Sequence, residues 1–88
     1  MMEKAFTITD YSGLQEQSAA KLAEVASKFT SRLNLEYEDK MVDLKSEMGL
    51  ISLGLEYQSG ITIIAEGKDE RDAMTVIEDT LMTTNIAK

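Results

Sequence analysis

Apolar and polar positions alternate along the first residues of the chain. Phe6 and Ile8 alternate with Thr7 and Thr9, a period of two that is typical of a half-buried β-strand. Residues 3–9 are therefore predicted to form a strand whose Phe6 and Ile8 side chains face the core. The turn-forming run DYSG at residues 10–13 ends it.

Alternation returns in the middle of the chain and predicts an antiparallel hairpin. Its inward positions are Leu33, Leu35 and Tyr37 in the first arm and Val42 and Leu44 in the second. A β-branched run at residues 61–65 follows the turn at residues 58–60 and is typical of a central strand.

Other segments repeat their apolar residues at helical spacing. Residues 16–30 predict an amphipathic helix with Ala19, Leu22, Ala26 and Phe29 on its buried face. Glu24 and Lys28 are expected to form an i,i+4 pair on its outer face. Residues 47–53 predict a short helical turn after Ser46. Asp69 is predicted to cap a closing helix that buries Ala73, Ile77 and Leu81.

The predicted order is strand, helix, strand, strand, short helix, strand, helix. Each helix has one apolar stripe, so the simplest arrangement is an α+β domain with a four-stranded antiparallel sheet and three helices on one face. With 88 residues, 43% of them hydrophobic, the chain is expected to form one domain over residues 1–88.

Charge and missing residue types exclude several functions. The net charge of −7 disfavours binding to nucleic acid or to anionic membranes and favours basic protein surfaces as partners. The chain has no cysteine and no histidine, which removes thiol nucleophiles, imidazole bases and the usual zinc ligands. We therefore expect a protein that is not an enzyme, with no cofactor and no metal. The acidic cluster of Asp69, Glu70 and Asp72 lacks the spacing of an EF-hand loop.

No apolar run approaches the roughly 20 residues of a transmembrane helix, and the first residues lack the apolar core of a signal peptide. No membrane insertion and a cytoplasmic location are the expectation.

Two sequence runs carry a resemblance to a known family. NLEY at residues 34–37 and VDLKSEMGLISLG at residues 42–54, together with the order of elements, resemble the HPr family. These proteins are the phosphocarriers of the bacterial phosphoenolpyruvate:sugar phosphotransferase system. The resemblance spans nearly the whole chain and implies the βαββαβα open-faced sandwich of that family.

The resemblance also identifies a degenerate phosphocarrier site. HPr proteins carry the phosphate on a histidine at the start of the first helix, followed by an arginine and a proline. This chain has Gln15, Gln17 and Ser18 at those places. The amide nitrogen of Gln15 has its lone pair delocalised and is not a nucleophile, and Gln17 lacks the cation that would balance a phosphate.

Ser46 allows two interpretations. It precedes a helical turn, where serine is an ordinary N-cap. The resemblance implies a second role, because Gram-positive HPr proteins are phosphorylated at this serine by HPr kinase/phosphorylase and then act as corepressors in carbon catabolite control. A phosphate at a helix N-terminus is favourable, whereas Glu47 beside it adds like-charge repulsion. Both interpretations stay open.

The resemblance implies a partner-binding surface as well. Met48 and Ile51 match an apolar pair that meets partner proteins in the family, although the i,i+3 spacing alone equally fits core positions. Leu50 and Leu53 are predicted to face the core. Glu47 beside Ser46 and Lys21 on the first helix belong to the same expected partner-binding set, although Glu24 dilutes the positive field of that helix.

The favoured hypothesis is a regulatory protein similar to the histidine-less Crh branch, docking to HPr kinase/phosphorylase and to a catabolite-control repressor or another phosphotransferase-system protein. One alternative is a diverged phosphocarrier with another phosphate acceptor. The other is an unrelated binding module on the same fold, with a homo-oligomer as one form.

Overall fold

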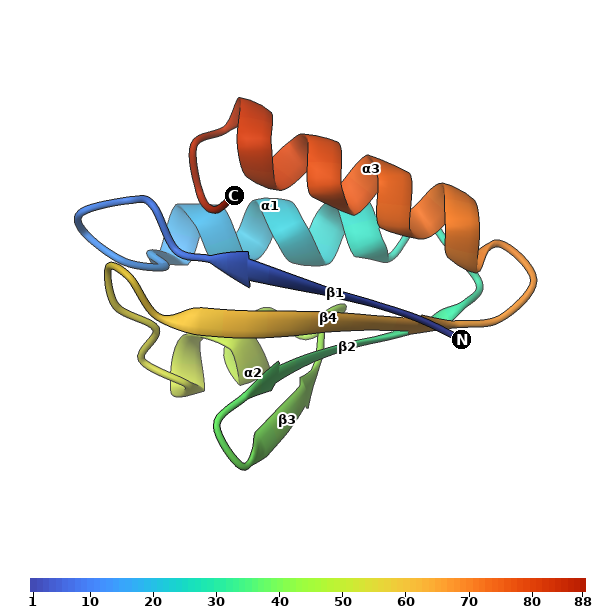
Figure 1. Ribbon diagram of the computed structural model, residues 1–88, viewed down its shortest axis with the longest axis horizontal. Coiled ribbons are helices and arrows are strands. Elements are labelled where there is room, and N and C mark those ends of the chain that lie inside the picture. Colours follow the sequence, from blue (N-terminus) through green and yellow to red (C-terminus); the bar gives the residue numbers. More distant parts are fainter.

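The computed structural model describes all 88 residues and contains four strands and three helices. The elements in chain order are β1 (Met2–Thr7), α1 (Glu16–Ala26), β2 (Arg32–Tyr37), β3 (Lys40–Asp43), α2 (Glu47–Ser52), β4 (Gly60–Glu66) and α3 (Glu70–Thr83). The strands form one antiparallel sheet in the order β1-β4-β2-β3 (Figure 1). The predicted α+β order is confirmed.

One face of the sheet carries the core. The strands contribute six buried side chains to it, Phe6, Leu33, Leu35, Ile61, Ile63 and Ala65, and the helices cover them with Ala19, Leu22, Leu50, Ile77 and Leu81. Helices α1 and α3 run side by side along the sheet (Figure 1), and α2 packs against α1. The opposite face has half-exposed or exposed residues such as Ala5, Thr62 and Met41. This is the predicted open-faced sandwich.

Helix α1 is shorter than residues 16–30 because its end is capped early. The Ser27 hydroxyl donates to the Ala23 carbonyl at 2.7 Å, an acceptor that the Ser27 backbone N–H also uses at 3.0 Å. Side-chain bonds of this kind compete with the regular helix ladder. The predicted Glu24–Lys28 pair is consequently wrong, since Lys28 lies beyond the helix, and Glu24 pairs with Lys21 instead at 3.7 Å.

The last residues of the chain close one end of the edge strand β1. Thr7 and Lys88 exchange two backbone hydrogen bonds of 2.7 and 3.0 Å, and Ile8 and Ala87 form an isolated antiparallel bridge. Strand β1 ends at Thr7 rather than at residue 9, while Phe6 and Ile8 are buried as predicted. No helix is both long and apolar enough to cross a bilayer.

Candidate protein-docking site

The start of α1 presents an amide side chain to solvent. Gln15 occupies the N-cap position with an extended backbone (φ −89°, ψ 171°), and its side chain makes no capping hydrogen bond. Its carbonyl accepts from the Ala19 N–H at 2.9 Å. Gln15, Glu16 and Gln17 are all exposed. The helix start is therefore well formed, but neither the Gln15 nor the Gln17 amide is a nucleophile that could carry a phosphate.

Gly13 fixes this helix start against the segment that follows α2. Its φ of +75° lies in the left-handed region, and the next residue, Leu14, donates its N–H to the Leu55 carbonyl at 3.0 Å. A Cβ atom at position 13 would overlap that carbonyl oxygen and lie 3.1 Å from the Glu56 Cα. Only glycine combines this φ with so close an approach of two backbones.

Replacing Gly13 by alanine should loosen this junction. We expect the Gly13→Ala variant to lose about 3 kcal/mol of unfolding free energy, from the positive φ and the overlap with the Leu55 carbonyl together. Gly54 is the matched control, because its φ is +62° but a Cβ there meets nothing within 4 Å. Gly54→Ala should lose only about 1 kcal/mol. Urea denaturation of both variants measures the difference, and equal losses would contradict the proposed overlap.

Ser46 caps α2, as the sequence predicts. Its backbone is extended (φ −104°, ψ 107°), and its hydroxyl oxygen accepts from the Gly49 N–H at 3.1 Å. Its carbonyl accepts from the Leu50 N–H at 3.1 Å. The residue is half-buried, as is Glu47 in the first turn.

The outer face of α2 is apolar. Met48 is 75% exposed and Ile51 is 38% exposed, whereas Leu50 and Leu53 are buried. The prediction that Leu50 and Leu53 face the core is confirmed. The Met48 thioether and the branched Ile51 side chain thus leave apolar surface exposed on α2.

The predicted site residues lie on two packed helices. Ser46, Glu47, Met48 and Ile51 belong to the beginning and outer face of α2. Gln15 and Gln17 lie at the start of α1, directly after Leu14, whose N–H bonds the Leu55 carbonyl, and the exposed Lys21 lies further along α1 beside Glu24. No three acidic residues gather in a way that would hold a metal ion.

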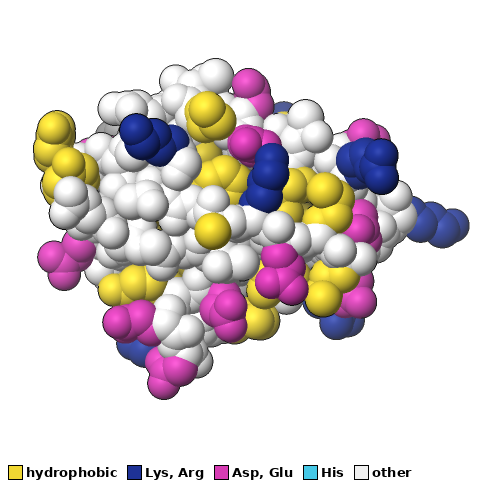
Figure 2. Space-filling model, viewed as in Figure 1, with side chains coloured by type: hydrophobic (Ala, Val, Ile, Leu, Met, Phe, Trp, Pro, Cys, Tyr) yellow, Lys and Arg dark blue, Asp and Glu magenta, His cyan; other side chains and the backbone are white.

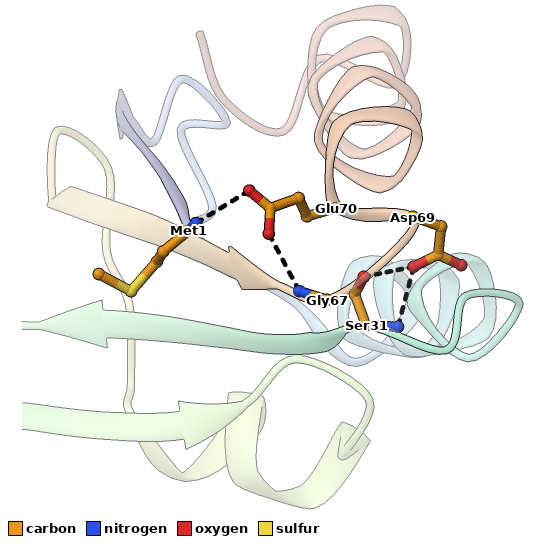
Figure 3. A network of polar contacts seen from close by, with 5 residues as sticks. All are labelled: Met1, Ser31, Gly67, Asp69 and Glu70. Atoms are coloured by element: carbon orange, nitrogen blue, oxygen red, sulfur yellow. Dashed lines mark hydrogen bonds and ion pairs between the residues drawn. The ribbon is translucent and has the colours of Figure 1, made fainter.

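Asp69 does not cap α3 with its side chain, contrary to the sequence prediction. Its carboxylate accepts instead from the backbone N–H and the hydroxyl of Ser31 (Figure 3). It also accepts from the Thr30 N–H, and both N–H bonds are 2.9 Å long. The Ser31 hydroxyl, with the Thr30 N–H next, lowers the pKa of Asp69 from 3.8 to about 2. These bonds tie the start of α3 to the chain that enters β2.

Glu70 completes this network. One of its oxygens accepts from the Gly67 N–H at 3.0 Å, and the other pairs with the Met1 ammonium at 3.0 Å (Figure 3). The Gly67 N–H, followed by the Met1 ammonium, lowers the pKa of Glu70. The acidic cluster at the start of α3 is thus a structural junction.

Sequence reasoning missed one exposed feature beside the α1 start. The rings of Tyr11 and Tyr57 lie 4.6 Å apart between centroids, tilted by 45°, although the residues are 84% and 40% exposed. Tyr11 lies in the turn before α1, and Tyr57 in the turn before β4. A tyrosine within each polar turn was the only available signal, because their contact depends on the tertiary fold.

The fold and the site together define a small α+β domain with an exposed apolar pair on α2 and a glutamine amide at the N-cap of α1. The family described as "PTS HPr component phosphorylation site" matches residues 2–83. The chain therefore belongs to the HPr family, the phosphocarrier proteins of the phosphotransferase system.

Solved structures agree with this membership. The histidine-containing phosphocarrier protein of Mycoplasma is 32% identical, with 99% of both chains covered and a TM-score of 0.96. HPr of Thermoanaerobacter tengcongensis is 35% identical, with 97% of this chain and 94% of that chain covered and a TM-score of 0.88. Crh of Bacillus subtilis, solved as a domain-swapped, intertwined dimer, is 37% identical over 83% of this chain and 84% of that chain, with a TM-score of 0.74.

Proposed function

We propose that this chain is a non-carrier member of the HPr family that acts in the cytoplasm by docking to other proteins of carbon catabolite control. The observation that carries the proposal is the α1 start, where an exposed amide occupies the N-cap. A phosphocarrier needs a nucleophile there whose phosphorylated form is reactive, and a glutamine amide supplies neither property. The function left to the chain under this proposal is binding to other proteins.

Ser46 is the proposed switch. Its hydroxyl already lies against the first turn of α2, where backbone N–H groups and the helix dipole favour an added phosphate. Phosphorylation would place about two negative charges at the edge of the Met48–Ile51 surface. Glu47 would repel them, so the phosphorylated form is expected to need a cationic group from a partner.

The proposed partners are HPr kinase/phosphorylase and a catabolite-control repressor. Met48 and Ile51 supply the apolar contact, since both are exposed on the helix that Ser46 caps. Lys21 contributes little attraction because it faces Glu24 at 3.7 Å. The docking is therefore expected to depend more on the apolar pair than on α1 charge.

Phosphorylation by a kinase tests the switch. After incubation with an HPr kinase and ATP, we expect one phosphate per chain on Ser46, located by mass spectrometry of peptides. Ser46→Ala should take none and, through the lost cap, unfold with about 1 kcal/mol less free energy. Ser52→Ala is the matched control, because Ser52 lies on the same helix and its hydroxyl bonds the Gly49 carbonyl at 2.7 Å. An unmodified Ser46 in the native protein would remove the switch.

A second pair of variants tests the apolar contact. Met48→Ala and Ile51→Ala should lower the rate of Ser46 phosphorylation with little change in stability, since both side chains are exposed. Met82→Ala on α3 is the control, with a 55% exposed methionine away from α2. Equal rates for all three variants would place the kinase contact elsewhere.

A further inference from the structure

The turn before α1 and the turn before β4 form one corner of the molecule, here called the acidic corner and defined as residues 8–17 and 54–59. Three backbone hydrogen bonds join its two segments: Ile8 N–H to the Ser59 carbonyl and Gln58 N–H to the Ile8 carbonyl, both 2.9 Å, and Leu14 N–H to the Leu55 carbonyl, 3.0 Å. The two turns are thereby held together on both sides of the tyrosine pair.

Tyr11 and Tyr57 project from the acidic corner. Hydrophobic side chains, which include tyrosine in the colouring, gather at the left end of the molecule over these two turns (Figure 2). The rings contact each other at 4.6 Å between centroids, yet the two residues stay 84% and 40% exposed. The contact uses part of each ring and leaves aromatic surface open to solvent.

The charges of the acidic corner have one sign. It contains Asp10, Glu16 and Glu56 and not a single lysine or arginine. The Asp10 carboxylate accepts one bond, from the Ser12 N–H at 2.9 Å, and no ion pair involves any of the three acids. Two lysines lie outside the defined residues. Lys88, whose backbone pairs with Thr7, borders the corner, and the Lys21 ammonium forms an ion pair with Glu24.

We propose that the acidic corner binds an arginine-bearing segment of a partner protein, with a guanidinium stacked on the Tyr11–Tyr57 pair and held by the flanking carboxylates. A cation is attracted to the face of an aromatic ring, and the planar guanidinium stacks better than the strongly hydrated lysine ammonium. Carboxylates beside the rings supply charge-assisted hydrogen bonds. Because the two turns are already fixed to each other, little ordering free energy is lost on binding.

This inference does not rest on the loss of the carrier step or on phosphorylation of Ser46. It concerns the charge and ring chemistry of the corner alone. The corner would also complement the α2 surface, because the proposed phosphorylated Ser46 likewise calls for a cationic partner. The two proposals can fail separately.

Titration of the isotope-labelled protein with short peptides tests the inference. The probes are glycine–serine peptides carrying two arginines, two lysines or two citrullines. We expect the arginine peptide to shift amide NMR signals at residues 10–16 and 55–58, with about threefold weaker binding of the lysine peptide and no detectable binding of the neutral citrulline peptide.

Substitutions then separate stacking from general charge attraction. Tyr11→Ala and Tyr57→Ala should each weaken arginine-peptide binding about threefold, and Glu56→Gln about twofold. Tyr11→Phe keeps the ring and should bind like the native protein, which also controls for folding. Asp72→Asn removes one charge from the exposed side of α3 and should leave binding unchanged.

Three results would overturn the proposal. The first is equal binding of the arginine and lysine peptides together with signal shifts spread over α3. The second is native affinity in both tyrosine-to-alanine variants. The third is concentration-dependent dimerisation of the protein alone that Tyr11→Ala abolishes, which would assign the corner to a second copy of this chain.

Discussion

We expect the native chain to take no phosphoryl group from phosphoenolpyruvate through the first enzyme of the phosphotransferase system, and the double variant Gln15→His, Gln17→Arg to take one. Gln15 stands exposed at the N-cap of a well-formed helix, so an imidazole there would meet the free N–H groups and the positive end of the helix dipole. Arginine at position 17 would return the cation that balances the phosphate. Transfer of radioactive label, measured on gels without acid treatment, gives the result.

Two controls make this comparison specific. Gln15→Asn keeps an amide at the same position and should remain unlabelled. Adding Ser46→Ala to the double variant should not change labelling, because the proposed carrier chemistry does not involve that hydroxyl. Label on the native chain would contradict the loss of the carrier step and would favour the alternative of a phosphocarrier with another acceptor.

Asp69→Asn should destabilise the protein strongly at neutral pH and much less in acid. The folded state holds the pKa of Asp69 at about 2, below its ordinary value of 3.8, through bonds from the Ser31 hydroxyl and the Thr30 N–H. A lowered pKa stabilises the folded state at pH values above 3.8, and this contribution disappears as the pH falls towards 2. Glu70, whose pKa is also lowered, is present in both proteins, so its pH-dependent contribution cancels from their difference.

Urea denaturation of both proteins across pH 2 to 7 measures this effect. The difference between native protein and Asp69→Asn should be constant from neutral pH down to about pH 5 and then shrink as the carboxylate is protonated. Ser31→Ala should lower stability over the same pH range, because Ser31 is buried and donates to Asp69. Asp72→Asn controls for removal of one charge from the same helix turn. A difference that does not change with pH would contradict the pKa assignment.

Much of the fold could be predicted because its elements bury one face each. The alternation of Leu33 and Leu35 and the branched run around Ile63 place these three side chains in the core, where all are at most 1% exposed. In such segments the spacing of the apolar residues matches the buried positions. The sequence therefore predicts both that the segment is a strand and which of its side chains face the core. Helix α1 ended early because Ser27 donates to the Ala23 carbonyl, a local competition that apolar spacing does not record.

Part of the candidate site could also be predicted from the sequence, and part of it could not. The Ser46 cap follows from a local rule, and the structure has the hydroxyl within 3.1 Å of the Gly49 nitrogen. Asp69 likewise precedes a helix in the sequence and is predicted to cap it. Its carboxylate instead accepts hydrogen bonds from residues 30 and 31, which are distant along the chain and adjacent only after folding. The Tyr11–Tyr57 contact is likewise tertiary. Short-range patterns predict caps and strands, whereas contacts between distant turns require the fold.

The exposure of Met48 and Ile51 was not decided by periodicity alone. An i,i+3 pair fits either the core or the surface, and the structure resolves the choice because Leu50 and Leu53 occupy the inward positions of α2. A six-residue helix has room for one buried face, so its remaining apolar side chains lie at the surface. This arrangement leaves an apolar contact beside the serine that the proposed function uses.

The central claim is that this chain docks to other proteins and does not relay phosphoryl groups. Its most direct test is to map the phosphorylated residues of the protein isolated from its own cells during growth on a rapidly used sugar. Peptide mass spectrometry should be run on paired samples, one untreated and one treated with hydroxylamine, because phosphate esters of serine resist hydroxylamine and acyl phosphates of Asp or Glu do not. The account predicts hydroxylamine-resistant phosphate on Ser46 and none elsewhere. Hydroxylamine-sensitive phosphate on any residue, or a Ser46 that is never phosphorylated under these conditions, would contradict it.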